Sequence, residues 1–135
     1  MARVLVVEDE SALRLLYRIA LKNNRYEVIA VESGNEALKV LEREQIDAVV
    51  SDLRLPDISG LRLIDEIQSQ HPFLPIIINT AYDFIGENSY GWRVAESVSK
   101  SSGTAGLMRA LARVISAEAE IPSRDSASSF HEWVL

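Results

Sequence analysis

The chain has 135 residues, of which 47% are hydrophobic and 25% charged, with no cysteine and a formal net charge of −6. This length suits one compact domain and is too short for a second full domain beside it. The composition excludes a disulfide scaffold and a thiolate metal site, and the negative charge argues against direct nucleic-acid binding. No apolar run approaches the roughly 20 residues that cross a bilayer, so we expect no membrane segment and a cytoplasmic protein.

Short apolar runs alternate with longer segments of helical periodicity along the chain. The runs lie at residues 4–7, 28–31, 48–50 and 76–78. This alternation predicts repeated strand–helix units, which form a parallel sheet with helices on both faces. The expected fold class is therefore α/β.

The helices are predicted from serine caps and from apolar spacing. Ser11, Ser33 and Ser59 are the expected N-terminal caps of the first three helices, and Pro72 ends the third helix before His71. The side chains predicted to face the core are Leu13, Leu16, Tyr17, Ala20 and Leu21 in the first helix, Ala37, Leu38 and Leu41 in the second, and Leu61, Ile64 and Ile67 in the third. The last helix is expected over about residues 104–117, with Leu107, Ala110, Leu111 and Val114 inward.

Two segments depart from this regular pattern. Residues 83–95 contain several glycine, serine and asparagine residues, which predicts a short or irregular fourth helix. We expect the domain to occupy residues 1–120, followed by a linker-like tail over 121–135 whose apolar end includes Phe130 and Trp133. Whether the chain is a standalone protein or a fragment stays open.

Charged and polar residues follow the predicted strands. Glu8 and Asp9 come after the first strand, Asp52 after the third, Thr80 after the fourth and Lys100 near the fifth. These side chains should meet, because the carboxyl ends of parallel strands share one edge of the sheet. Three clustered carboxylates repel one another, so a divalent cation such as Mg²⁺ is the expected partner. Asp52 is the predicted nucleophile for a phosphoryl group.

The segments VLVVEDE at residues 4–10, DLRLPDISG at 52–60 and TAY at 80–82, followed by Lys100, resemble the receiver domains of two-component response regulators. The resemblance covers about residues 3–117. It implies a flavodoxin-like doubly wound sheet of five parallel strands in the order 2-1-3-4-5. It also implies that a histidine kinase phosphorylates Asp52 in a Mg²⁺-dependent reaction and that the domain catalyses its own phosphorylation and dephosphorylation.

The same resemblance assigns roles to individual residues. Glu8 and Asp9, together with Asp52 and the backbone carbonyl of Arg54, would bind Mg²⁺. Thr80 matches the switch hydroxyl of the family, and Lys100 matches the lysine that contacts the acyl phosphate.

Two departures from the family pattern keep other functions open. Ser101 stands where most relatives have a proline after the lysine, and Ser97 replaces the usual switch aromatic. A degenerate receiver that acts as a phosphorylation-independent interaction module is therefore the main alternative. An acid-cluster phosphatase of similar topology is another, although it would need a second acid at the position of Arg54.

The first helix carries a row of basic and apolar residues outside its predicted buried face: Arg14, Leu15, Arg18, Ile19 and Lys22. Such a row is either solvated or a contact surface. In receivers this helix docks the histidine kinase or a phosphotransfer protein, which is the partner that the resemblance implies. Output would pass to a downstream protein or to an output domain outside this sequence, and homodimer formation stays open.

Overall fold

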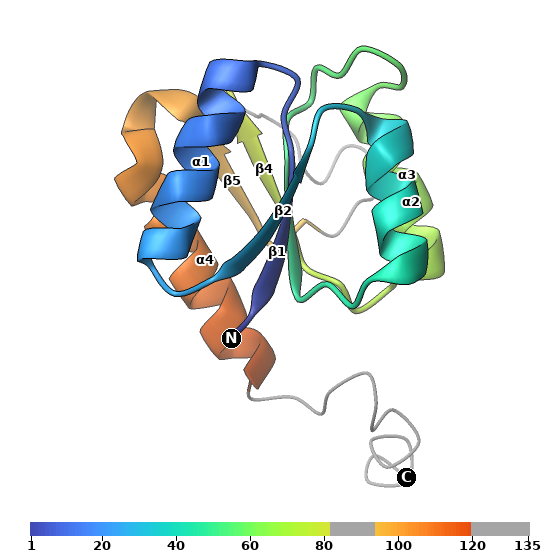
Figure 1. Cartoon of the computed structure of the whole chain (residues 1–135). Helices are drawn as coiled ribbons and strands as arrows, with labels where there is room; N and C mark the ends of the chain where they lie inside the picture. The colour runs from blue at the N-terminus through green and yellow to red at the C-terminus, as the bar shows by residue number, and fades with distance from the viewer. Residues whose placement is uncertain (82–93, 120–135) are drawn as a thin grey trace, which may run out of the picture.

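A computed structural model describes residues 1–81 and 94–119. Strands and helices alternate through most of this part of the chain, as the apolar runs predict (Figure 1). The described elements are β1 (Arg3–Val7), α1 (Ser11–Asn23), β2 (Glu27–Val31), α2 (Gly34–Arg43), β3 (Ala48–Ser51), α3 (Gly60–Gln70), β4 (Ile76–Thr80), β5 (Glu96–Ser99), the 3-10 turn η1 (Lys100–Ser102) and α4 (Gly103–Ala119).

The described strands form one parallel sheet in the order β2-β1-β3-β4-β5, which confirms the predicted topology. Val7 at the end of β1 pairs with Ser51 at the end of β3, so the residues that follow these two strands leave the sheet side by side. Thr80 at the end of β4 pairs with Ser99 at the end of β5. The register therefore gathers the polar residues after the strands at one edge.

Each face of the sheet has its own hydrophobic core, because successive strand side chains point to opposite faces. Helices α2 and α3 cover one face and α1 and α4 cover the other (Figure 1). The α2–α3 core includes Leu5, Val49, Ile76, Ile78, Leu63, Ile64 and Ile67. The α1–α4 core includes Val4, Val6, Val50, Ile77, Tyr17, Leu107, Ala110, Leu111 and Val114. Burial on both faces fixes the strand register, since a slip of one residue would exchange the two cores.

Two of the predicted helix caps are confirmed. The Ser33 side chain accepts a hydrogen bond from the backbone N–H of Glu36, and Ser59 accepts one from the N–H of Arg62. Helix α3 ends at Gln70, directly before the His71–Pro72 sequence, as expected. The first turns of α2 and α3, which border the loops at the carboxyl edge, are thus held by side chains close in sequence.

The prediction for the first helix was wrong in two respects. Ser11 is already helical, and the cap residue is the extended Glu10, which makes no side-chain cap hydrogen bond. Leu16 was expected in the core but is 48% exposed, because α1 rests on the sheet along the narrow line of Tyr17 and Leu21. In the next two helices Leu38 and Leu61 are only half-buried, whereas Val40 and Leu63 are buried.

Two predictions fall outside the described residues. The short or irregular fourth helix was expected within 83–95, most of which is not described, and so was the tail over 121–135. Within the residues that the structure does describe, no helix combines the length and apolar character needed to cross a membrane.

Candidate functional site

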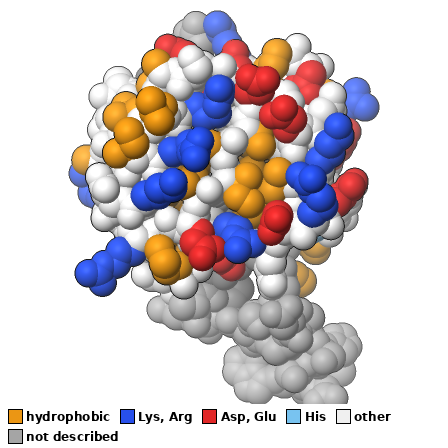
Figure 2. All heavy atoms as spheres, in the orientation of Figure 1, with side chains coloured by type: hydrophobic (Ala, Val, Ile, Leu, Met, Phe, Trp, Pro, Cys, Tyr) orange, Lys and Arg blue, Asp and Glu red, His pale blue; other side chains and the backbone are white. Residues whose placement is uncertain are grey.

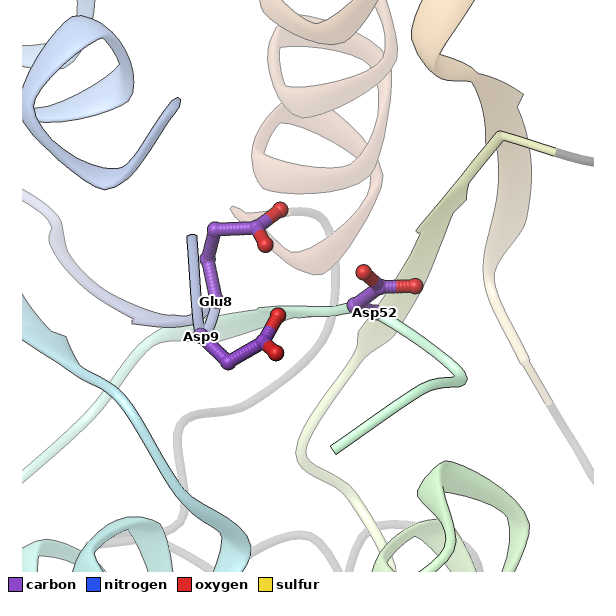
Figure 3. Close-up of side chains that lie close together, drawn as sticks. All are labelled: Glu8, Asp9 and Asp52. Atoms are coloured by element: carbon purple, nitrogen blue, oxygen red, sulfur yellow. The ribbon is translucent and has the colours of Figure 1, made fainter. Parts of the chain in front are cut away.

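The three acids of the sequence prediction meet at the carboxyl edge of the sheet. Figure 3 shows the carboxylates of Glu8 and Asp9, from the end of β1, and of Asp52, from the end of β3, pointing into the same space. One oxygen from each lies within 4.8 Å of the others. Glu8 is 2% exposed and Asp52 is 7% exposed, whereas Asp9 is open to solvent. The cluster therefore has a buried side and an accessible side.

Lys100 lies directly against the buried side of this cluster. Its Nζ donates to Asp52 Oδ2 at 2.8 Å and lies 2.7 Å from Glu8 Oε1. Burial alone would lower the pKa of Lys100, but the hydrogen bonds to the two carboxylates outweigh burial, so the pKa is raised and the ammonium stays charged. Lys100 contacts two of the three carboxylates, and its single positive charge does not balance all three.

Glu8 is the most deeply buried acid of the site. Burial raises its pKa, and the contacts with Lys100 and with the backbone N–H of Glu10 oppose that rise. Its two oxygens have separate partners: Oε1 faces Lys100, and Oε2 accepts the hydrogen bond from Glu10 at 3.2 Å. The carboxylate is thus oriented by contacts on both oxygens.

Serine side chains build the turn that presents Lys100. The Ser99 hydroxyl accepts a hydrogen bond from the backbone N–H of Ser101 at 3.3 Å, and the Ser102 hydroxyl donates to the carbonyl of Ser99 at 2.7 Å. These bonds support the η1 turn where relatives have a proline, and no cis peptide occurs among the described residues. The departure in sequence therefore leaves Lys100 within hydrogen-bond distance of Asp52.

Thr80 and Ser97 occupy neighbouring strands beside the site. Thr80 is the last residue of β4 and is buried. Ser97 lies in β5, pairs with Ile78 and is exposed, so a small hydroxyl occupies the position where the family usually carries an aromatic side chain. Thr80 thus ends β4, and the neighbouring strand carries a serine instead of an aromatic side chain at position 97.

The loop after Asp52 is held close to the beginning of α3. The backbone N–H of Arg54 donates to Asp52 Oδ1 at 3.2 Å, and the N–H of Gly60 donates to the carbonyl of Leu53 at 3.0 Å. The Arg54 side chain is exposed. A Cβ atom on Gly60 would lie 2.6 Å from the Asp52 carbonyl oxygen, so only glycine allows this approach without movement of the loop.

Sequence reasoning missed two contacts that shape the surroundings of the site, one made by Asp57 and one by Tyr17, which was predicted only as a core residue. Asp57 accepts hydrogen bonds from the N–H groups of Gly34 and Asn35 at the first turn of α2. Although its slight burial acts to raise the pKa of Asp57, these N–H donors lower it. Tyr17 is buried, and its hydroxyl is hydrogen-bonded to the Asn79 side chain beside Thr80. Neither contact is local in sequence, so neither leaves a pattern that periodicity can detect.

This sheet order, with an acid cluster and a lysine at its carboxyl edge, defines a receiver-type domain. A family model described as the response regulator receiver domain matches residues 4–112. The chain belongs to this family.

Several curated relatives are similar to part of the chain. It is 43% identical over 84 residues to the transcriptional regulatory protein GlrR of Escherichia coli K12, covering 62% of this chain and 19% of GlrR. The match to the transcriptional regulator NtrC of Proteus hauseri is 42% over 79 residues and covers 58% of this chain and 17% of NtrC. The chain thus spans about a fifth of these curated relatives.

A solved structure is similar over nearly its whole length. The response regulator TrrA of Thermotoga maritima, in complex with Mg²⁺-BeF, is 34% identical, with a TM-score of 0.78 over 84% of this chain and 99% of TrrA. TrrA has also been solved in complex with the histidine kinase ThkA, where the match covers 85% of this chain with the same identity and TM-score.

Proposed function

We propose that the chain is a signalling receiver that accepts a phosphoryl group on Asp52. The observation that carries the proposal is the position of the Asp52 carboxylate, which touches Lys100 and lies in a cluster with Glu8 and Asp9. The cluster that contains this buried carboxylate is open to solvent at Asp9, and Lys100 supplies a cation on its buried side. Both features favour attack on an acyl phosphate or a phosphoramidate rather than a purely structural ion pair.

The donor set suits Mg²⁺. The site offers three carboxylate oxygens within 4.8 Å of one another, which are hard ligands of the kind that this ion prefers. The negative charge of the three carboxylates is more than Lys100 alone neutralises. We assign Glu8, Asp9, Asp52 and the backbone carbonyl of Arg54 as the residues that would hold it. When bound, the cation would neutralise charge on the transferring group and orient it for in-line attack.

The chain's own residues would carry the transfer. An oxygen of Asp52 forms the new bond to phosphorus, while the bond from phosphorus to the donor's histidine nitrogen breaks and the nitrogen keeps the electron pair. The Lys100 ammonium, already beside Asp52, balances negative charge on the phosphoryl oxygens, and the Thr80 hydroxyl can donate a hydrogen bond to one of them. Hydrolysis of the acyl phosphate by water returns the carboxylate and releases phosphate.

Incubation with acetyl phosphate and Mg²⁺ tests this function through the intact mass of the protein. The wild type is expected to gain the mass of one phosphoryl group, and Asp52→Asn is expected to gain none because the amide lacks the nucleophilic oxygen. Asp65→Asn, a matched change at an exposed position of α3, should be modified like the wild type. A chelator should prevent modification of the wild type and of Asp65→Asn.

The alternative of a phosphorylation-independent interaction module predicts a different outcome. In that case the wild type would remain unmodified with acetyl phosphate, with phosphoramidate and with kinase donors. Modification that persists in Asp52→Asn would instead place the acceptor elsewhere.

We further propose that α1 is the docking face for a sensor histidine kinase or phosphotransfer protein. Leu15 and Ile19 are 57% and 49% exposed, and Arg18 and Lys22 are exposed beside them. Figure 2 shows apolar side chains next to a row of basic ones on the side of the molecule where Figure 1 places α1. The complex of TrrA with ThkA supports a kinase as the partner class. We place this exchange in the cytoplasm, with output through a downstream protein or an additional domain.

Ile19→Asp is expected to slow transfer from a kinase that phosphorylates the wild type by about tenfold or more, because it puts a charge into an apolar contact. Its reaction with acetyl phosphate should be unchanged, since the residue lies outside the acid cluster. Phe73→Asp, a similar change at a residue that is 57% exposed after α3, is the matched control. Equal kinase transfer to wild type and Ile19→Asp would exclude this face as the docking surface.

A further inference from the structure

The sequence places Arg14 in the basic and apolar row of α1, but its side chain turns away from that surface. Its Nη1 donates to the backbone carbonyl of Glu8 at 2.9 Å and to that of Asp9 at 3.2 Å. Its Nη2 lies 3.9 Å from the carboxylate of Glu32 at the end of β2. The side chain is 22% exposed, whereas Arg18, one turn later, is exposed. Arg14 therefore contacts the loop between β1 and α1 rather than presenting a free cation.

The backbone of this loop directs the side chains of two consecutive acids to the same side. Successive side chains of an extended strand point to opposite faces, yet the carboxylates of the consecutive residues Glu8 and Asp9 point into the same space (Figure 3). The chain must leave the strand conformation between them. Their two carbonyls are the groups that Arg14 binds together, so the guanidinium holds the peptide units that set the direction of both acids.

Among the described residues, the other hydrogen bonds that hold this loop act on Glu8. The N–H of Glu8 continues the sheet by donating to the carbonyl of Val31, and Glu8 Oε2 accepts the N–H of Glu10. Asp9 is exposed, and its backbone carbonyl is joined to α1 through Arg14. Arg14 is itself fixed, because its own N–H donates to the carbonyl of Glu10 in the first turn of α1.

We propose that Arg14 is a positioning residue that holds Glu8 and Asp9 in the geometry in which both carboxylates can bind one divalent cation. This inference rests on the proposed function, because it takes the acid pair as the metal site. A guanidinium suits the role, since its planar array of donors can bind neighbouring carbonyls with a fixed geometry. Residues that orient metal ligands typically change metal affinity by 10- to 100-fold when they are replaced.

Arg14→Gln is compared with Arg18→Gln, the same change on the same helix at an exposed residue. Mg²⁺ alone is titrated into each protein by calorimetry. We expect Arg14→Gln to raise the Kd for Mg²⁺ by about tenfold, whereas Arg18→Gln leaves it unchanged. In phosphorylation with acetyl phosphate, Arg14→Gln should raise the Mg²⁺ concentration for half-maximal rate and leave the rate at saturating Mg²⁺ close to that of the wild type. A general loss of folded protein would lower the maximal rate instead.

A metal-free readout separates the failure of this inference from the failure of the proposed function. Amide hydrogen exchange at Glu10, whose N–H bonds to Glu8, should accelerate in Arg14→Gln without Mg²⁺ and stay unchanged in Arg18→Gln. Unchanged exchange, or unchanged Mg²⁺ affinity in a wild type that binds Mg²⁺, would overturn the role of Arg14. A wild type that binds no Mg²⁺ would overturn the metal site and this inference together. If Arg14→Gln does not fold, Arg14→Lys, which keeps one donor group, should show an intermediate Kd, and a wild-type Kd would overturn the proposal.

Discussion

Lys100→Met is expected to lower the free energy of unfolding at pH 8 by about 3–5 kcal/mol, the usual cost of removing one partner from a buried ion pair. The ammonium contacts both Glu8 and Asp52, which are almost fully buried. Methionine matches the length of the lysine stem but supplies no charge, so two neighbouring carboxylates would remain without their cation. Their mutual repulsion adds to the cost of keeping each of them out of water.

The stability lost in Lys100→Met should increase with pH. Burial raises the pKa of Glu8 and Lys100 opposes that rise, so removing Lys100 raises this pKa further. The folded variant then binds a proton at pH values where the unfolded chain, with the ordinary Glu pKa of 4.5, has released it. The variant keeps its full stability below pH 4.5, the unfolded-state value. Its stability falls as the pH rises from there through the pKa of Glu8 in the folded protein. The deficit relative to wild type should therefore be larger at pH 8 than at pH 5.

Urea denaturation at the two pH values, in the absence of divalent cations, measures both effects. Lys39→Met, at an exposed position of α2, is the matched control and should change the stability by less than about 0.5 kcal/mol at either pH. If the two variants lose equal stability, or the Lys100 deficit does not change with pH, Lys100 is not the cation that stabilises the buried carboxylates.

Gly60→Ala is expected to lower the free energy of unfolding by about 1–3 kcal/mol, the range found for overpacked sites. Helix propensity alone predicts the opposite sign, because alanine is favoured over glycine by about 1 kcal/mol within a helix. The structure nevertheless predicts a loss of stability, since the new Cβ would lie 2.5 Å from Leu53 Cα and 2.6 Å from the Asp52 carbonyl oxygen. Both are backbone atoms and cannot be relieved by a change of rotamer.

The same substitution should slow phosphorylation, because relief of the contact moves either the first turn of α3 or the loop that carries Asp52. Thermal unfolding and the rate of mass gain with acetyl phosphate measure the two consequences. Gly34→Ala is the matched control at the first residue of α2, where the new Cβ would meet the Ile58 side chain at 2.6 Å. That side chain can move, so a smaller loss is expected. A Gly60→Ala protein as stable and as reactive as wild type would contradict the tight approach.

Local sequence features predicted β1 to β4 and the sheet edge because their causes are local, whereas β5, which has no apolar run, was expected only from the family resemblance. Apolar runs bounded by polar residues mark buried parallel strands, and parallel strands end at a common edge. Glu8 and Asp52 could be placed together for that reason, since Glu8 directly follows the run at 4–7 and Asp52 lies two residues after the run at 48–50. The caps at Ser33 and Ser59 were equally accessible, because a cap hydrogen bond spans only three residues.

The turn at Lys100 shows where a family pattern is insufficient. A missing proline suggested an altered loop, yet the hydroxyls of Ser99 and Ser102 support a turn from which the lysine reaches Asp52. A pattern records which residue type is absent. It does not show whether other side chains can satisfy the same backbone groups.

The sequence by itself determined the fold class, the strand order implied by the family resemblance and the identity of the acids at the sheet edge. Only the tertiary structure decided the exposure of Leu16 and the direction of Arg14. A helix of given periodicity can rest on a sheet along more than one line, and the line is set by packing against the strands and against α4. A long side chain such as Arg14 chooses between solvent and backbone carbonyls according to which acceptors the neighbouring loop leaves within reach.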